Sequence, residues 1–314
     1  MSRAPADQRV LGRGLVFLAA FFWGTTATLA RSVFRDQGVP AQTVVELRLA
    51  IAASLLFAWL LTRARALLRI EPRDRAYIAF LGLFGVAAVQ GSYYYAISRL
   101  GVGLAILLQY VAPSLIVLWE LVRGKRPSPA TVAAVLMALG GTALLVRGVD
   151  TSAVHASTFD WIVGASCAPV FAFYVLASKR AVTRYAPETV LAWTFALAAV
   201  FWACVTPPWR ILAAGYPAAV WWRFAFLGVF STLVPFRCFY AGLKRLPAAE
   251  AGVIATAEPV VAIVSAFLFL GEGLKPGQLA GAALVIVAAV LAARGDTDPA
   301  AEERRVEQPE TTRS

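Results

Sequence analysis

The sequence predicts an all-α membrane protein whose ten transmembrane helices form two inverted five-helix repeats, with the N and C termini in the cytoplasm. Three observations support this prediction. The 314 residues are 60% hydrophobic and only 15% charged. The apolar residues gather in long runs, and landmarks of the first half recur about 147 residues later. Soluble domains contain roughly 45–50% apolar and about 25% charged residues, so this composition excludes a soluble globular protein and a disordered one.

Ten apolar runs are long enough for membrane-spanning helices, each of which requires about 20 mostly apolar residues. No run shows the strict alternation typical of a transmembrane β-strand. The connections between the runs are short, which leaves no room for a soluble domain. The ten runs are 13–30, 41–62, 75–98, 102–122, 129–146, 160–178, 188–206, 222–243, 248–270 and 277–293.

Prolines and sequence context define the elements of the first half. The run 13–30 follows arginines, as in a signal peptide, but residues 28–31 form a poor cleavage site, so we expect a retained first helix. Pro40 precedes the second run, Pro113 lies near the middle of the fourth, and Pro129 opens the fifth. Proline is accepted in the first turn of a helix and kinks the helix when it lies inside.

The second half repeats these prolines at equivalent positions. Pro187 precedes the seventh run, Pro259 lies within the ninth, and Pro276 opens the tenth; each follows its counterpart by 146 or 147 residues. Because each half contains five spans, an odd number, the second repeat is inserted upside down relative to the first. Inverted repeats recur in secondary transporters, where the substrate site lies near the bilayer midplane between the halves. The expected repeats are residues 13–147 and 160–294.

The distribution of Lys and Arg predicts the orientation. With the N terminus in the cytoplasm, twenty of the 29 basic residues lie on the inside and seven on the outside, while Arg48 and Arg237 lie within spans. The positive-inside rule therefore places both termini in the cytoplasm and favours an even number of spans. The net charge of +11 then reflects topology, so no nucleic acid partner is expected. We expect a multi-pass protein of the inner membrane, with the lipid bilayer as its partner.

Neither the C-terminal tail nor the cysteines and the histidine indicate a catalytic, disulfide or metal site. Residues 295–314 mix acids with arginines and contain no large apolar residue, a composition typical of a disordered cytoplasmic tail. The three cysteines lie in separate spans and His155 stands alone, so neither a disulfide framework nor a metal site is expected. The chain contains no Walker A motif, dinucleotide-binding motif or nucleophile elbow. We therefore expect no enzymatic activity and no cofactor.

Several short motifs occur in a defined order along the chain. They are Phe22-Trp23-Gly24, Glu46-Leu47-Arg48, Ala257-Glu258-Pro259-Val260, Phe269-Leu270-Gly271-Glu272 and the Gly277 to Gly281 opening of the tenth span. Together with the inverted duplication, these motifs resemble the EamA-type families of the drug/metabolite transporter superfamily over about residues 13–294. The resemblance implies export of amino acids, nucleosides or other metabolites. One departure is Gly124-Lys125, which stands where the second half has Gly271-Glu272.

Ionisable residues inside spans tend to face the bundle interior, because insertion into lipid costs roughly 2.5–3.5 kcal/mol. Glu258 lies near the centre of the ninth span, beside a proline; it either binds a proton or a substrate ammonium group, or serves as a structural acid. Arg48 either meets a substrate carboxylate or pairs with a helix C terminus or with Glu258. Glu46 lies nearer the outer end of the same span as Arg48, and we expect it at the interface.

The two mid-span prolines predict helices that line a cavity. Pro113 and Pro259 lack an N–H group and so free the carbonyl groups of Gln109 and Ala255. A freed carbonyl at membrane depth requires protein or water as a partner, which favours a cavity wall over a simple packing kink.

Further candidates have polar tips or aromatic rings. Arg237 lies about ten ångströms from the inner end of its span and either extends to the cytoplasm or faces the cavity. An aromatic cavity with a few polar groups suits an amphipathic small molecule. The other candidates for its wall are Trp23, Gln90, Tyr94, Gln109, Tyr110 and Tyr174. Gly277-x-x-x-Gly281 permits close helix approach, either in a homodimer or within one bundle.

We therefore expect a secondary transporter that exports small metabolites, such as amino acids or related amphipathic compounds, by alternating access around a midplane cavity. The substrate would move down its gradient or in exchange for protons. One alternative is an organic-phosphate or nucleotide-sugar exchanger on the same fold, which requires several midplane cations where only Arg48 and Arg237 are present. Another is a membrane enzyme or a non-transporting scaffold, which requires clustered catalytic side chains or a large extramembrane surface.

Overall fold

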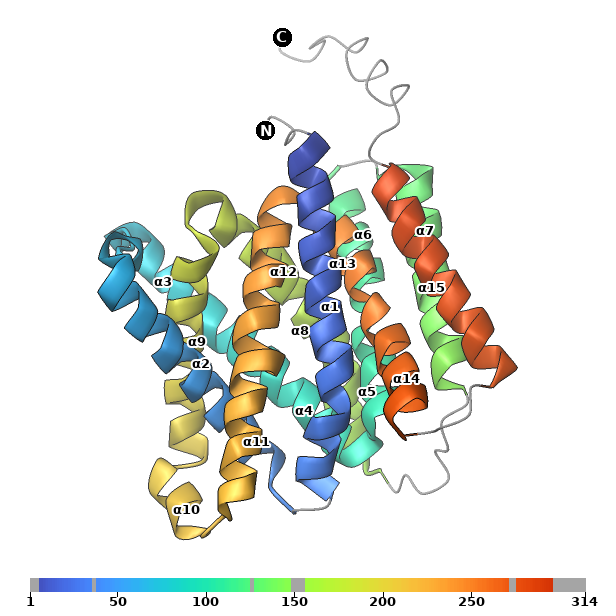
Figure 1. The fold of residues 1–314 in the computed structure, drawn as a ribbon. Helices are drawn as coiled ribbons and strands as arrows, with labels where there is room; N and C mark the ends of the chain where they lie inside the picture. Colours follow the sequence, from blue (N-terminus) through green and yellow to red (C-terminus); the bar gives the residue numbers. More distant parts are fainter. Residues whose placement is uncertain (1–5, 36–37, 125–126, 148–155, 271–274, 296–314) are drawn as a thin grey trace.

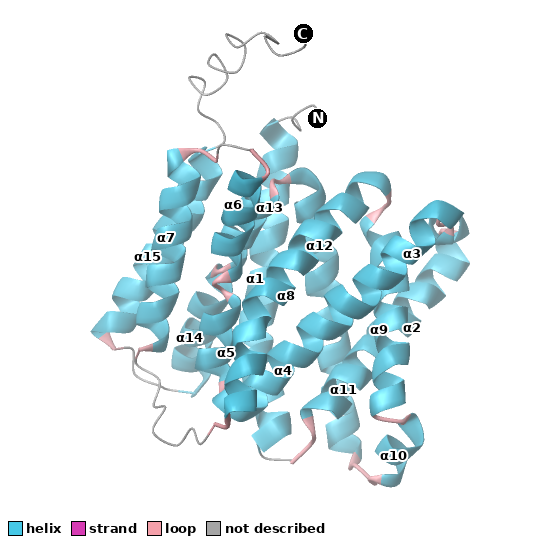
Figure 2. Cartoon of the chain, turned by 180° about the vertical axis from the view of Figure 1, so that it is seen from behind, coloured by secondary structure: helices cyan, strands magenta, loops and turns pink. Residues whose placement is uncertain are grey.

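The protein is a bundle of helices joined by short loops (Figure 2). The computed structural model describes residues 6–35, 38–124, 127–147, 156–270 and 275–295, and within these residues there is no β-strand. This agrees with the predicted all-α class. The predicted tail from residue 296 and His155 lie outside the described residues.

Nine segments of the described chain are long and apolar enough to cross a membrane. They do not include α1, a 30-residue helix that packs along α12 and α14, so the count of ten spans stays a prediction. The α-helices are α1 (Ala6–Arg35), α2 (Ala41–Arg63), α3 (Pro72–Phe80), α4 (Ala88–Leu100), α5 (Val102–Gln109), α6 (Ala112–Val122), α7 (Pro129–Val146), α8 (Thr158–Arg184), α9 (Pro187–Val205), α10 (Pro208–Ala213), α11 (Ala218–Gly228), α12 (Val234–Arg245), α13 (Ala248–Ala255), α14 (Ala257–Leu270) and α15 (Pro276–Gly295).

The start of α1 and the end of α15 lie at the same end of the bundle (Figure 1). We call this the terminus end, and the opposite side the far end. The α4–α5 turn at Gly101 lies at the far end. An even number of crossings produces this arrangement, whereas the assignment of the terminus end to the cytoplasm stays a prediction.

Two segments contain a wider turn of π-helix. The turn η2 (Leu81–Ala87) joins α3 to α4, and η3 (Val229–Leu233) joins α11 to α12. A π-helix pairs each N–H with the carbonyl five residues back and so inserts one residue into the α-helical pattern. A third short helix, η1 (Arg65–Leu68), follows α2.

Two further segments are broken near their middle, where the prolines predict a break. α5 ends at Gln109 and α6 begins at Ala112, with Pro113 in its first turn. In the second half, α13 ends at Ala255 and α14 begins at Ala257. A proline in the first turn of the second helix costs no hydrogen bond, because the N–H groups there have no intrahelical partner.

Helices α7 and α15 lie side by side and meet through glycine. A Cβ atom at Gly281 would lie 2.6 Å from the carbonyl oxygen of Gly141, and one at Gly141 would lie 2.8 Å from that of Gly281. Nothing lies within 4 Å of the corresponding position at Gly277. The structure therefore uses Gly281 for packing within one bundle, and dimerisation through this motif stays a prediction without structural support.

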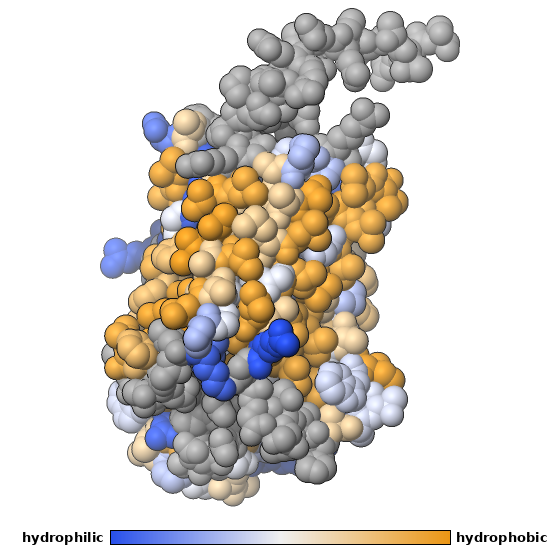
Figure 3. Space-filling view, turned by 90° about the vertical axis from the view of Figure 1, so that its right-hand side faces the viewer, coloured by the Kyte–Doolittle hydropathy of each residue, from blue (hydrophilic) through white to orange (hydrophobic). Residues whose placement is uncertain are grey.

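The lateral surface of the bundle is apolar. Figure 3 shows a broad hydrophobic band on one side of the molecule. Tryptophans near the ends of spans, such as Trp59 and Trp222, are 43% and 77% exposed. A lipid bilayer covers such a surface in a membrane protein, and indole rings favour its interface with water.

Candidate functional site

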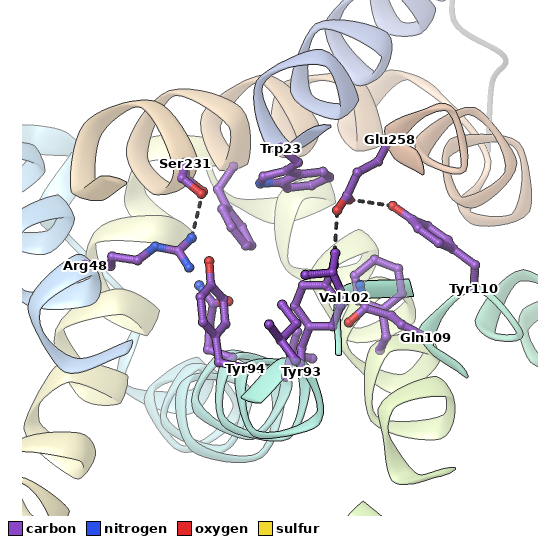
Figure 4. A pocket seen from close by; sticks show the side chains of 14 residues that line it. Trp23, Arg48, Tyr93, Tyr94, Val102, Gln109, Tyr110, Ser231 and Glu258 are labelled. Carbon is purple, nitrogen blue, oxygen red and sulfur yellow. Dashed lines mark hydrogen bonds between the residues drawn. The ribbon is translucent and has the colours of Figure 1, made fainter. Parts of the chain in front are cut away.

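A small cavity of about 50 Å³ lies within the bundle, between helices of both halves (Figure 4). Its wall is mostly aromatic and aliphatic, and it contains one arginine and one carboxylic acid among the described lining residues. The lining residues are Trp23, Arg48, Val89, Gln90, Tyr93, Tyr94, Ile97, Val102, Gln109, Tyr110, Phe171, Ser231, Phe236 and Glu258.

Glu258 enters the cavity from the first turn of α14. It is 5% exposed, and its two oxygens accept from different tyrosines: Tyr110 at 2.6 Å and Tyr93 at 3.2 Å. The Tyr110 hydroxyl also lies 3.0 Å from the carbonyl oxygen of Ala255, the group that Pro259 leaves without an intrahelical donor. The break in the second half is therefore bridged by a side chain from the break in the first half.

Arg48 enters the cavity from α2 on the opposite wall (Figure 4). Its Nε donates to Thr232 Oγ1 and its Nη2 to the Ser231 carbonyl oxygen, both at 2.8 Å. Its guanidinium lies 4.4 Å from the centre of the Tyr94 ring, within range of a cation–π interaction. Ser231 and Thr232 belong to η3, so the wider turn supplies the oxygens that hold the cation.

The third guanidinium nitrogen of Arg48 donates no hydrogen bond to a described residue. Its Nη1 atom is buried and has no hydrogen-bond partner among the residues that the structure describes, although the residue is only 2% exposed. A buried donor without a partner costs about 1–3 kcal/mol, and more when it is charged. The guanidinium is therefore oriented by two bonds and retains a donor for another group.

Gly24 brings α1 against α14 at the level of the cavity. A Cβ atom at this position would lie 2.6 Å from the backbone oxygen of Glu258 and 2.9 Å from the backbone nitrogen of Ala262. Only glycine permits this approach without movement of a helix. Trp23, the preceding residue, lines the cavity beside Glu258 (Figure 4).

An aromatic layer lies on the terminus-end side of the cavity. The ring of Phe236 lies 5.1 Å from Trp23, 5.5 Å from Phe195 and 6.3 Å from Tyr174, measured between ring centres. On the other side, Ile97 and Val102 flank the α4–α5 turn at the far end. The described lining thus reaches the α4–α5 turn on the far-end side, and aromatic side chains pack together on the terminus-end side.

The cavity brings together seven of the nine predicted substrate-binding or coupling residues. They are Trp23, Arg48, Gln90, Tyr94, Gln109, Tyr110 and Glu258. Tyr174 is fully buried one layer away, in contact with the rings of Phe236 and Tyr240, so it does not line the cavity. Arg48 also differs from one expectation, because its bonded partners lie in η3 and not at a helix C terminus or on Glu258.

Of the two alternatives for Arg237, the structure agrees with extension away from the cavity and not with the cavity role. Glu46 lies near the start of α2, as expected, but it is buried between helices. Arg237 donates to Glu188 Oε1 at 2.9 Å, and its side chain is 55% exposed outside the cavity. Glu46 is 3% exposed, because the N-terminal part of α2 packs against α9 and α11. Hydropathy gives the depth of a residue but not the side of the helix on which neighbours pack.

Sequence reasoning missed Tyr93, which binds Glu258, and Ser231, which binds Arg48. A signal for Tyr93 exists, because residues three, four and seven positions apart share one face of a helix. Starting from Gln90, this spacing selects Tyr93, Tyr94 and Ile97, all of which line the cavity. Ser231 acts through its backbone carbonyl, for which the residue type gives no signal.

Ion pairs join the two halves at both ends of the bundle. At the terminus end, Arg13 contacts Glu250 at 2.7 Å and Arg184 contacts Asp74 at 2.7 Å. At the far end, Arg99 contacts Asp160 at 3.1 Å. These polar contacts add to the packing between helices of the two halves, such as α7 with α15 and α1 with α12.

A bundle of apolar helices around a cavity with one buried acid and one buried arginine defines a polytopic membrane protein with an internal polar site. The model of the EamA-like transporter family matches residues 10–147 and 161–294. The chain therefore belongs to the EamA-like transporter family, within the drug/metabolite transporter superfamily, and is a multi-pass protein of the inner membrane.

Known proteins resemble almost the whole chain. The threonine/homoserine exporter RhtA of Escherichia coli (strain K12) is 30% identical over 299 residues, which cover 94% of this chain and 93% of RhtA. The uncharacterized inner membrane transporter YicL of Salmonella typhimurium (strain LT2) is 23% identical, with 88% and 93% covered. One crystal structure matches with a TM-score of 0.73 at 24% identity over 92% of this chain and 98% of its own, which shows the fold alone.

Proposed function

We propose that this protein exports small zwitterionic metabolites of the amino-acid class by alternating access, with Arg48 and Glu258 as the charged ends of the binding site. The observation that carries the proposal is the placement of one buried cation and one buried carboxylate on opposite walls of a single cavity (Figure 4). An amino acid presents the complementary charges, a carboxylate and an ammonium group. The similarity to a threonine/homoserine exporter supports the same class.

Arg48 is suited to bind the substrate carboxylate. Two of its nitrogens are held by Thr232 and Ser231, while Nη1 retains its donors without a partner among the described residues. A charge-assisted hydrogen bond to a carboxylate would satisfy Nη1. Because the guanidinium is already held in place, binding would require little ordering of this side chain.

Glu258 is suited to bind the substrate ammonium group or an exchanged proton. The Tyr110 hydroxyl has one proton and lies within hydrogen-bonding distance of two acceptors, Glu258 Oε2 and the Ala255 carbonyl oxygen. A proton on Glu258, donated to the Tyr110 oxygen, would let both contacts form fully. A proton and an ammonium group are thus alternative partners of the same carboxylate, as exchange requires.

The shape of the cavity supports alternating access. We infer that the side lined by Ile97 and Val102 opens toward the far end and that the packed rings around Phe236 form the closed side. With the termini in the cytoplasm, this arrangement faces outward. The inward-facing arrangement would require the ion pairs Arg13–Glu250 and Arg184–Asp74 to separate, and Glu250, whose side chain is 4% exposed, would need a new partner or access to water.

The exchanger of organic phosphates receives less support. Arg48 is the one cation among the described lining residues, and Glu258 opposes it. Arg237, the second cation counted for this alternative, lies outside the cavity. A dianionic phosphate group would therefore meet one positive and one negative charge.

Transport into proteoliposomes tests the proposal. The wild-type protein is expected to move labelled threonine and homoserine, and Arg48→Gln and Glu258→Gln are each expected to reduce the rate by about 10- to 100-fold, because a hydrogen bond to a charged group contributes roughly 1.5–3 kcal/mol. Arg63→Gln, at the exposed end of α2, is the matched control and should leave the rate unchanged.

Substrate analogues separate the two roles. Threonine methyl ester lacks the carboxylate, so the wild-type protein should move it as poorly as Arg48→Gln moves threonine, and Arg48→Gln should move both compounds equally. A pH gradient should accelerate wild-type transport but not transport by Glu258→Gln. If both variants moved threonine at the wild-type rate, the assignment of the site would be wrong.

A further inference from the structure

A second hollow lies at the terminus end, over the outer face of α12. It has a volume of about 560 Å³ and is bounded by α1 on one side and the start of α9 on the other. We call it the α12 groove. Its described lining residues are Gln8, Leu15, Pro187, Glu188, Arg237, Cys238, Ala241, Lys244 and Arg245.

The α12 groove faces away from the central cavity. Successive residues of an α-helix are rotated by about 100°, so residues three, four and seven positions apart share a face. Phe236, Tyr240 and Leu243 form the buried face of α12, with exposures of 6%, 0% and 0%. Arg237, Ala241 and Lys244 repeat the same spacing one position later and therefore lie on the outer side. A substrate in the groove would have no direct path to the cavity.

The surroundings of the groove place it where lipid headgroups lie. Leu11 and Leu18 on the adjoining helix α1 are 48% and 40% exposed, as expected for side chains that face hydrocarbon. The guanidinium of Arg237 lies 5.7 Å from the ring centre of Trp59, which is 43% exposed. Indole rings favour the membrane interface, so Trp59 places Arg237 at the hydrocarbon side of the interface, and Lys244 and Arg245 follow further along α12 toward the terminus end.

The charge of the groove is positive. Arg237, Lys244 and Arg245 line it against a single carboxylate, Glu188, which is bound to Arg237. Arg245 is oriented by its bonds to Gln8 Oε1 at 2.9 Å and to the Ala241 carbonyl oxygen at 2.7 Å. Lys244 is exposed at the mouth of the groove. A hollow with a net excess of cations and small residues in its floor fits a phosphate group.

We propose that the α12 groove binds the phosphate headgroup of an anionic phospholipid, with the acyl chains lying along the apolar face of α1. The headgroup phosphate meets Lys244 and Arg245, and the glycerol region lies over Ala241. Basic pockets between transmembrane helices bind anionic lipid headgroups in this way, and each cation near the surface strengthens the binding by about fivefold.

Native mass spectrometry of the full-length protein in detergent micelles tests this proposal. Phosphatidylglycerol is expected to remain bound at concentrations where phosphatidylcholine of the same chain length does not. Lys244→Gln should weaken phosphatidylglycerol binding by about fivefold, and Lys244→Gln with Arg245→Gln by about 25-fold, with no change for phosphatidylcholine. Thermal melting of each variant without lipid shows that the fold is retained.

Arg123→Gln is the matched control. Arg123 is also an exposed cation over an interfacial tryptophan, 5.2 Å from the ring centre of Trp119, but it lies outside the groove. Its removal should leave phosphatidylglycerol binding unchanged. The proposal is overturned if Arg123→Gln weakens binding as much as Lys244→Gln does, or if phosphatidylcholine binds equally well. Displacement of the lipid by millimolar inorganic phosphate would also overturn it, because the groove would then be a general phosphate site.

Discussion

The close contact at Gly24 allows the packing of α1 against α14 to be tested by a substitution that adds a single methyl group. In Gly24→Ala, the new Cβ atom would lie 2.6 Å from the backbone oxygen of Glu258, 2.8 Å from Val261 Cβ and 2.9 Å from the backbone nitrogen of Ala262. Two of these three atoms belong to the backbone, so no side-chain rotation relieves the contact. Helix α1 or α14 must move.

The size of the movement follows from the same distances. An ordinary van der Waals contact begins near 3.4 Å, so a contact at 2.6 Å requires a displacement of about 0.8 Å at this point. Overpacking of this kind costs about 1–3 kcal/mol. The higher helix propensity of alanine offsets roughly 0.5–1 kcal/mol of this loss of stability. We therefore expect a net loss of stability of about 0.5–2 kcal/mol.

The displacement also affects the cavity, because the nearest atom belongs to Glu258. Its carboxylate should shift relative to Tyr110 and Tyr93, which bind it at 2.6 and 3.2 Å. Gly24→Ala should therefore lower the apparent melting temperature in detergent by roughly 2–6 °C and reduce transport of threonine in proteoliposomes. Both measurements are made on the same preparation.

Gly14→Ala is the control for helix propensity. Gly14 lies in the same helix, and nothing lies within 4 Å of its Cβ position, so the substitution should be neutral or slightly stabilising. Equal melting temperatures and equal transport rates for Gly24→Ala and Gly14→Ala would refute the packing argument, since the two variants differ only in the neighbours of the added methyl group.

Two further predictions concern other contacts. Thr232→Val removes the oxygen that accepts from Arg48 Nε and leaves another buried donor unpaired, so stability should fall by about 1–3 kcal/mol and transport should fall with it, whereas Thr232→Ser should restore both in the same melting and transport assays. Gly281→Ala should separate α15 from Gly141 on α7 and lower the melting temperature, whereas Gly277→Ala should not change it; the reverse order would contradict the contact.

The helical class and the depth of the site could be predicted from the sequence because both follow from strong free-energy terms. A charged residue such as Arg48 or Glu258 inside an apolar run is costly in lipid, so its position indicates an internal cavity. A mid-span proline lacks the N–H that would continue the helix through the carbonyl four residues earlier, so Pro113 and Pro259 indicate where a helix breaks.

The direction of each side chain was harder to predict. Arg237 and Tyr174 lie at a suitable depth, but neither lines the cavity. In the segment of Arg237, the turn η3 inserts one residue between α11 and α12. A 3.6-residue period extended from α11 therefore assigns the residues of α12 to the wrong face. Around Tyr174, apolar side chains on most sides of α8 also hide which face contacts protein and which contacts lipid.

The wider turns carry a consequence for the ancestry of the chain. η3 begins 148 residues after η2, which is close to the spacing of the paired prolines. A one-residue insertion at the same place in both halves is expected if a single gene already encoded it before duplication. In the second half this turn holds Arg48, whereas η2 packs against α8 and α9. On this view both halves inherited the π-helical turn, and only the copy in the second half came to bind Arg48. The two halves then differ in their side chains while their backbones share the turn.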